Sequence, residues 1–184
     1  MDGDKEETTY IVSEEATEAL PIHESSPSKW EVGFSGEVII KAAEDVDGIY
    51  VQAVTEETMN LSDKIRKELK EYSKYSLKPS AIPAIGSFIA ILLDDNLYRA
   101  RITDVNGEAI SIFLVDFGSS STVSLDKIRV LPDRFFEYPP CITRISLARV
   151  ERPPGALPTT VKDVLENCLN QNVIKFLLFH QRPV

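Results

Sequence analysis

The sequence predicts a mainly β (α+β) fold in which one helix joins a small β-barrel to a second group of strands. Three observations support this expectation. Residues 86–130 hold several short apolar segments rich in β-branched residues and separated by tight-turn signals. Residues 56–75 carry apolar residues at helical spacing. Further strand-like segments precede the helix, over residues 36–54, and follow the barrel, over residues 141–179.

The N-terminal segment is the most acidic part of the chain. The 184 residues carry a net charge of −9, and the first 30 contain eight acidic and two basic residues. Because such a composition buries little apolar surface, we expect residues 1–29 to be a disordered acidic tail. The acidic balance also argues against tight nucleic-acid binding, since that affinity comes mainly from neutralising phosphates.

The ordered part is expected to begin with a hairpin and a helix. Residues 36–43 and 48–54 read as strands around the turn signal Glu44-Asp45-Val46-Asp47-Gly48. The helix follows over residues 56–75, and its apolar face consists of Leu61, Ile65, Leu69 and Tyr72. Pro79 and Pro83 then require the helix to end by Ser76.

A dense β region comes next and should close into a small barrel. Its strand-like segments are residues 87–93, 97–103, 109–117 and 121–125, with a short fifth strand expected within 126–133. The turn signals between them are Asp94-Asp95-Asn96, Asn106-Gly107 and Gly118-Ser119-Ser120. After the break at Pro139-Pro140, we expect a strand at 141–150, a helix at 160–170 and a last strand at 173–179.

Within this region the sequence resembles a known family. The runs GSFIAILLDDNLYRARI (86–102), FLVDFG (113–118) and IRVLP (128–132) resemble the Tudor family. With its flanking elements, the chain resembles the extended Tudor domain, in which a Tudor barrel is inserted into a staphylococcal-nuclease-like OB fold. The resemblance implies a division into residues 30–82 (first part of the nuclease-like subdomain plus linker helix), 83–137 (Tudor barrel) and 138–184 (second part).

The resemblance also implies a peptide-binding site at the open end of the barrel. The family holds a dimethylated guanidinium between four aromatic rings, with an asparagine as polar anchor, because aromatic faces attract a delocalised cation. Tyr98 and Phe117 match two of the ring positions. Leu92 and Leu114 stand at the other two, and Ser119 replaces the asparagine. The expected peptide-binding site is therefore these five residues, with an incomplete aromatic cage.

Several functions follow from the resemblance. The first is a non-catalytic scaffold that recruits a Piwi/Argonaute-type or other germ-granule protein in small-RNA (piRNA) silencing, without dependence on arginine methylation. The partner segment would be an arginine-glycine-rich stretch or part of another granule component, with RNA reached only indirectly. The implied location is the cytoplasm, in perinuclear germ granules. Symmetric-dimethylarginine reading, single-stranded RNA binding by the OB-like part and a structural or self-association role remain open as alternatives.

The same residues also allow purely structural interpretations. Tyr98 could cover the barrel mouth, and Arg99 and Asp116 could pair to hold the strand ends together. Three apolar residues, Phe88, Phe113 and Val115, are expected on the inner face of the barrel. The aromatic residues Phe135, Phe136 and Tyr138 are expected to anchor the barrel to the OB-like part.

An enzyme is not expected from this sequence. The acids Glu44, Asp45 and Asp47 crowd a turn without an arginine set for phosphodiester cleavage. His23 and His180 lie near opposite ends of the sequence, so a Cys–His or Ser–His arrangement has little support. The two cysteines favour neither a disulfide framework nor a zinc site. We therefore expect no catalytic residues, no cofactor, no metal and no membrane association.

Overall fold

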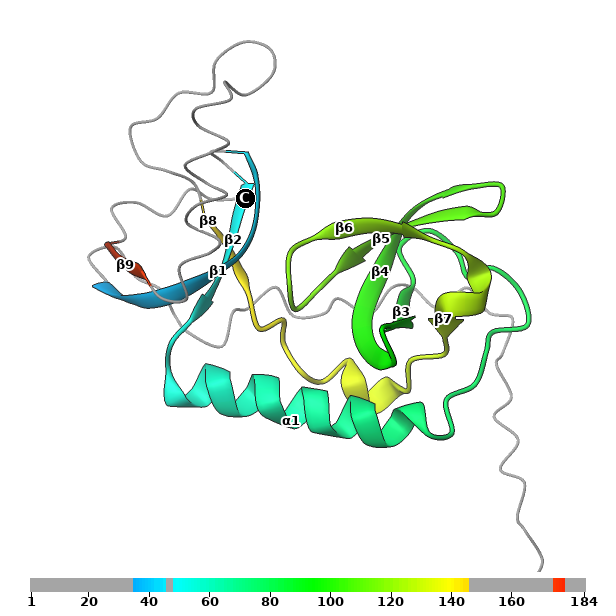
Figure 1. Ribbon diagram of the computed structural model, residues 1–184, viewed down its shortest axis with the longest axis horizontal. Helices are drawn as coiled ribbons and strands as arrows, with labels where there is room; N and C mark the ends of the chain where they lie inside the picture. Colours follow the sequence, from blue (N-terminus) through cyan, green and yellow to red (C-terminus); the bar gives the residue numbers. More distant parts are fainter. Residues whose placement is uncertain (1–34, 46–47, 146–173, 178–184) are drawn as a thin grey trace, which may run out of the picture.

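Two β-sheets and one long helix make up the fold (Figure 1). The computed structural model describes residues 35–45, 48–145 and 174–177. A four-stranded sheet and a five-stranded sheet are separately hydrogen-bonded, and the helix runs beneath both of them. The mainly β (α+β) class predicted from the sequence is confirmed.

The four-stranded sheet is built from both ends of the described chain. Its strands are β1 (Ser35–Asp45), β2 (Gly48–Ala53), β8 (Thr143–Ile145) and β9 (Ile174–Leu177). They pair in the order β8-β2-β1-β9, and every pair is antiparallel. The β1–β2 hairpin predicted around residues 44–48 is confirmed, because Asp45 pairs with Gly48.

Helix α1 (Glu56–Ser73) follows β2 directly. The Thr55 side chain caps its N-terminus by accepting a hydrogen bond from the backbone N–H of Thr58 at 3.2 Å. Two glutamates occupy the first turn, where negative charge is favourable. Three of the four predicted face residues, Ile65, Leu69 and Tyr72, are buried, and Leu61 packs beside them.

The five-stranded sheet comes from the middle of the chain. Its strands are β3 (Phe88–Leu93), β4 (Asn96–Asn106), β5 (Ala109–Leu114), β6 (Ser120–Val123) and β7 (Ile128–Arg129). They pair antiparallel in the order β6-β5-β4-β3-β7. Short 3-10 turns lie at Leu125–Lys127 and Asp133–Phe135. Among the described residues no ladder joins β6 to β7, so the expected complete closure is not recorded.

A two-residue turn connects β3 to β4. Asp94 and Asp95 both have positive φ, 45° and 61°, and Leu93 pairs with Asn96 across the turn. Positive φ at both central residues is typical of the hairpin turns whose twist matches that of the flanking strands. The predicted acidic turn is therefore present, and it is a tight hairpin.

Two apolar clusters lie on opposite faces of the five-stranded sheet. The barrel cluster lies on one face and consists of Ile89, Ile91, Ala100, Ile102, Ile110, Ile112 and Ile128. The helix-side cluster joins the other face to α1 and consists of Ile65, Leu69, Tyr72, Ala90, Leu97, Leu131, Phe135 and Cys141. Both faces of β3 are thus covered by apolar residues.

The clusters correct part of the prediction for the inner face. Phe88 packs against the helix-side cluster, and the Phe113 ring lies 5.3 Å from the Tyr50 ring of β2. The alternation of side chains along a strand puts the isoleucines inside and these two phenylalanines outside. Val115 is buried, but neither of these two clusters includes it, so its place on the inner face stays a prediction.

The segment that leaves the five-stranded sheet ties it to α1. Phe135 is fully buried in the helix-side cluster, and the Tyr138 hydroxyl donates to Glu68 at 3.1 Å. The Tyr72 hydroxyl of α1 donates to the Val130 carbonyl at 2.6 Å. The aromatic residues after the barrel therefore anchor it chiefly to the helix. The expected tail (1–29), most of the strand at 141–150 and the helix at 160–170 lie outside the described residues.

Candidate functional site

Two aromatic rings stand together at one end of the five-stranded sheet. Tyr98 comes from β4 and Phe117 from the bend after β5, and their centroids lie 5.3 Å apart at 79°. This edge-to-face geometry is one of the two that aromatic pairs favour. Phe117 is 36% exposed and Tyr98 is half-buried, so the pair presents apolar surface to solvent. The sequence prediction that these two rings meet is confirmed.

The bend at residues 114–119 sets the position of Phe117. The Leu114 carbonyl accepts from the N–H groups of Phe117 and Gly118, at 3.1 and 2.8 Å, and the Leu114 N–H donates to the Ser119 carbonyl. Gly118 has φ +75°, and a Cβ there would lie 2.3 Å from the Tyr50 side chain. Only glycine fits this position, because it tolerates positive φ and leaves room for the ring.

The structure brings together only some of the predicted site residues. Leu114 and Tyr98 both pack against the barrel cluster. Leu92 packs against the helix-side cluster instead, whereas its neighbour Leu93 packs against the barrel cluster. Ser119 is half-buried at the bend. The sequence could not show which of these two adjacent leucines faces the barrel cluster, because a continuous apolar run carries no alternation.

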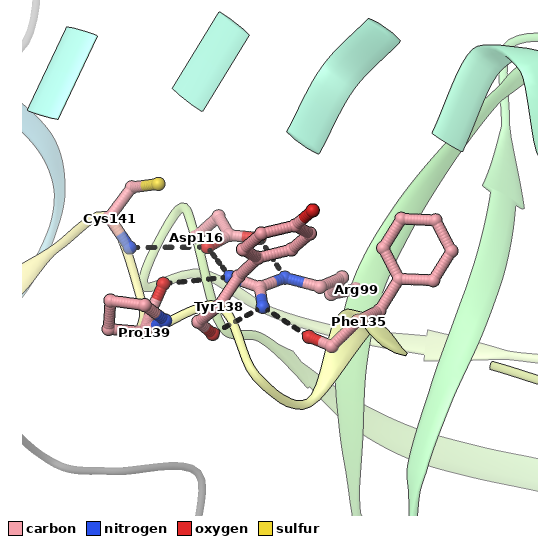
Figure 2. A network of polar contacts seen from close by, with 6 residues as sticks. All are labelled: Arg99, Asp116, Phe135, Tyr138, Pro139 and Cys141. Atoms are coloured by element: carbon pink, nitrogen blue, oxygen red, sulfur yellow. Dashed lines mark hydrogen bonds and ion pairs between the residues drawn. The ribbon is translucent and has the colours of Figure 1, made fainter. Parts of the chain in front are cut away.

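A buried arginine supports the bend from below (Figure 2). Arg99 is 1% exposed and donates to both carboxylate oxygens of Asp116, at 2.9 and 2.6 Å. It also donates to the carbonyls of Phe135, Tyr138 and Pro139, at 2.8, 2.7 and 3.0 Å. All five guanidinium N–H groups therefore have acceptors. The expected structural pairing of Arg99 with Asp116 is confirmed.

Asp116 has a further partner from the exit segment, the residues that follow the second 3-10 turn. The backbone N–H of Cys141 donates to it at 3.2 Å. Burial, followed by the nearby Asp116 charge, raises the pKa of the Cys141 thiol to about 12. This thiol therefore stays protonated at neutral pH and is a poor nucleophile.

A cleft of about 140 Å³ opens beside the aromatic pair. Its walls come from β1, α1, β4, the bend and the exit segment. The lining residues are Lys41, Ser62, Ile65, Arg66, Leu69, Lys70, Asn96, Leu97, Tyr98, Arg99, Asp116, Phe117 and Cys141. Tyr98 and Phe117 thus form one wall of a cleft shared by both sheets and the helix.

Lys41 was not singled out from the sequence. Its ammonium lies 5.8 Å from the Phe117 ring centroid, within reach of a cation–π contact. Burial lowers the pKa of Lys41, the nearby Cys141 opposes this, and the positive charge of Arg66 lowers the pKa further. A lysine in the first strand carries no local signal for this contact, because β1 and the bend are brought together only by the tertiary fold.

Metal and membrane sites are not indicated in the part of the chain that the structure describes. No group of three or more histidine, cysteine or acidic side chains is arranged to hold a metal ion there. None of the helices in the described ranges is both long and apolar enough to span a membrane.

Comparison with known proteins identifies the same fold elsewhere. A family model for the Tudor domain matches residues 32–149. The extended Tudor domain of human TDRD1, in complex with a symmetrically dimethylated peptide, is similar with a TM-score of 0.74 and 17% identity, covering 86% of this chain and 79% of that one. The extended Tudor domain TD3 of mouse TDRD1, in complex with a MILI peptide containing dimethylarginine, gives a TM-score of 0.75 and 14% identity, covering 85% and 82%.

Sequence relatives give the same result over shorter stretches. Tudor domain-containing 6 of Danio rerio is 33% identical over 69 residues, which is 37% of this chain and 3% of that protein. Tudor domain-containing protein 7B of the same organism is 24% identical over 118 residues, 62% of this chain and 11% of that protein. The chain thus spans a small part of the curated relatives it matches. At the identities of the two solved structures, the likeness establishes the fold alone.

Proposed function

The chain belongs to the Tudor domain family, and from that premise we propose that it is a non-catalytic scaffold module that binds a partner protein without requiring arginine methylation. The observation that carries the proposal is the Tyr98–Phe117 pair, which is open to solvent and borders the cleft. The similar TDRD1 domains are bound to peptides with dimethylated residues. This supports a peptide of a partner protein as the ligand class here.

The proposal that methylation is not required rests on the incomplete cage. Leucines stand at two of the four positions where the family has rings. Each missing ring removes about 0.5–2 kcal/mol of cation–π attraction, so the two together remove about 1–4 kcal/mol. That range corresponds to a roughly five-fold to several-hundred-fold loss of affinity for a methylated guanidinium. The face of Phe117 is also already approached by the Lys41 ammonium.

The cellular setting is proposed from the family and its relatives. We propose that the partner is a Piwi/Argonaute-type protein, bound through an arginine-glycine-rich segment or another stretch, or another germ-granule component. The assembly would act in small-RNA (piRNA) silencing in cytoplasmic, perinuclear granules, with RNA contacted only through the partner. The MILI peptide bound to the similar mouse domain supports a protein segment as the ligand, and the cellular setting is our own proposal.

Calorimetry with paired peptides tests the proposal. The same arginine-glycine peptide would be titrated unmodified and symmetrically dimethylated into the full chain. We expect affinities within about twofold of each other, or no heat from either peptide, because two rings give little discrimination. Tighter binding of the methylated form by about tenfold or more, lost in Phe117→Ala, would make the chain a methylarginine reader. Tyr75→Ala is the matched control, since Tyr75 is 60% exposed and does not line the cleft.

A further inference from the structure

The cleft beside the aromatic pair has an excess of positive charge. Lys41, Arg66 and Lys70 line it, and Asp116 is the one acidic side chain among its described lining residues. The Asp116 carboxylate is already bound by the Arg99 guanidinium and the Cys141 N–H. The Asp116 carboxylate therefore has little capacity left to balance the charges of Lys41, Arg66 and Lys70.

Among these cations, Lys41 is the one most affected by the excess of positive charge. It is half-buried, and no ion pair joins it to a residue in the described ranges. Arg66 lies close enough for its charge to lower the Lys41 pKa, whereas Arg66 itself pairs with Asp63 on the exposed face of α1. A partly buried charge without a counterion is costly, so an incoming anion gains more here than at an ordinary surface lysine.

A cationic ligand would meet the opposite situation. A guanidinium entering beside Phe117 would have to displace Lys41 or lie against it, and Arg66 and Lys70 would add further repulsion. Arg66 and Lys70 are exposed, so their part of this repulsion weakens as the salt concentration rises. The chemistry of the cleft therefore disfavours the arginine side chain and favours a carboxylate.

Resting on the proposed function, and naming the ligand of that same site, we propose that the cleft binds a carboxylate side chain from an acidic segment of the partner. Lys41 receives the carboxylate, with Arg66 and Lys70 at the entrance, and Tyr98 and Phe117 form the apolar wall on which the aliphatic part of a glutamate packs. At about 140 Å³, the cleft holds about five waters' worth of volume, which suits one side chain. Lys41 is then the specificity determinant that separates acidic from cationic ligands.

The test is a fluorescence anisotropy titration of the full chain with labelled hexaglutamate and, as the uncharged equivalent, hexaglutamine. We expect hexaglutamate to bind at low salt, to weaken at high salt, and to bind at least about tenfold more tightly than hexaglutamine. Lys41→Gln should weaken hexaglutamate binding by roughly tenfold, the effect of losing one charge-assisted hydrogen bond. Its thermal midpoint should not fall, because the substitution removes a half-buried charge that no ion pair joins within the described ranges.

Control variants make the outcome specific. Lys67→Gln removes the same charge from an exposed position of α1 outside the cleft, and it should leave hexaglutamate binding within about twofold of wild type. Equal binding of the two peptides, or equal loss in Lys41→Gln and Lys67→Gln, would overturn the proposal. Such a failure would leave the proposed function standing if the methylated and unmethylated arginine-glycine peptides still behave alike.

The acidic N-terminal segment of the chain is the competing occupant. A full-chain variant with Glu6, Glu7, Glu14 and Glu15 changed to glutamine keeps the length of that segment and removes four of its eight negative charges. We expect its hexaglutamate affinity to match that of wild type. A clear gain of affinity in this variant would identify the chain's own segment as the occupant, and would overturn the assignment to a partner.

Discussion

Replacing Arg99 with lysine should strongly destabilise the fold, although the charge is kept. Lysine offers three N–H donors on a flexible stem, whereas Arg99 uses all five guanidinium N–H groups. At least two acceptors therefore lose their partner in a buried site. Hydrogen bonds involving a charged group contribute about 1.5–3 kcal/mol each, so the expected loss is about 3–6 kcal/mol. Domains of this kind have a total stability of about 5–15 kcal/mol.

Urea denaturation followed by circular dichroism measures this loss. The matched control is Arg101→Lys, because Arg101 is an exposed arginine on the same strand. We expect that control to stay within about 0.5 kcal/mol of wild type. A loss below about 1 kcal/mol for Arg99→Lys would show that the buried network contributes far less than its geometry implies, and would refute the reasoning.

A double variant separates the ion pair from the rest of the network. Replacing both members of a buried ion pair by apolar residues is often nearly neutral. Here Arg99→Met with Asp116→Leu should remain clearly destabilised, because three carbonyls of the 135–139 segment lose their donor and the Cys141 N–H loses its acceptor. Recovery of wild-type stability in the double variant would mean that solvent satisfies these backbone groups.

Four further measurements should give separable results. Gly118→Ala should cost about 2–6 kcal/mol, since it combines positive φ with overlap against the Tyr50 ring; an unchanged thermal midpoint would contradict this. In Cys168→Ser, which leaves Cys141 as the sole thiol, labelling by a thiol reagent at about pH 8 should be slow in the native state and fast in denaturant, because the native pKa is about 12. The pKa of the Cys141 thiol is 9.0 in the unfolded chain and about 12 in the fold. The contribution of this thiol to stability is therefore complete below pH 9.0 and is lost as the pH rises toward 12. Alkaline denaturation curves would show this loss. Thr55→Ala should cost about 1 kcal/mol by removing the α1 cap, whereas Thr55→Ser should cost less; equal losses would argue against the cap.

The sequence predicted the positions of helices and strands better than it predicted which side of a strand each residue occupies. Turn residues and the helical spacing of Ile65, Leu69 and Tyr72 place α1 and the hairpins to within a few residues. The strand β3, by contrast, is apolar on both sides, because one face packs on α1 and the other lines the barrel cluster. A continuous apolar run carries no alternation, so the phase of Phe88 and of Leu92 could not be read from it.

Only those residues of the candidate site that lie in short motifs of the family could be predicted from the sequence. Tyr98 and Phe117 lie on neighbouring segments of one sheet, and their motifs identify them. The cleft also needs Lys41 from β1 and Arg66 from α1, which are distant in sequence from the bend. Their contribution depends on the packing of two sheets against one helix, for which this sequence alone holds no short-range signal.

The pairing of β9 with β1 has a consequence for the order of folding. Val38 pairs with Ile174, whereas the five-stranded sheet is made from hairpins between residues 88 and 129. Local contacts form quickly, and a contact that closes so long a loop forms slowly. During synthesis, the five-stranded sheet can therefore fold on the ribosome while one edge of β1 is still unpaired. The second edge of β1 stays unpaired until β9 has been synthesised. Until then, this unpaired edge is a point at which a nascent chain is open to chaperones or to mispairing.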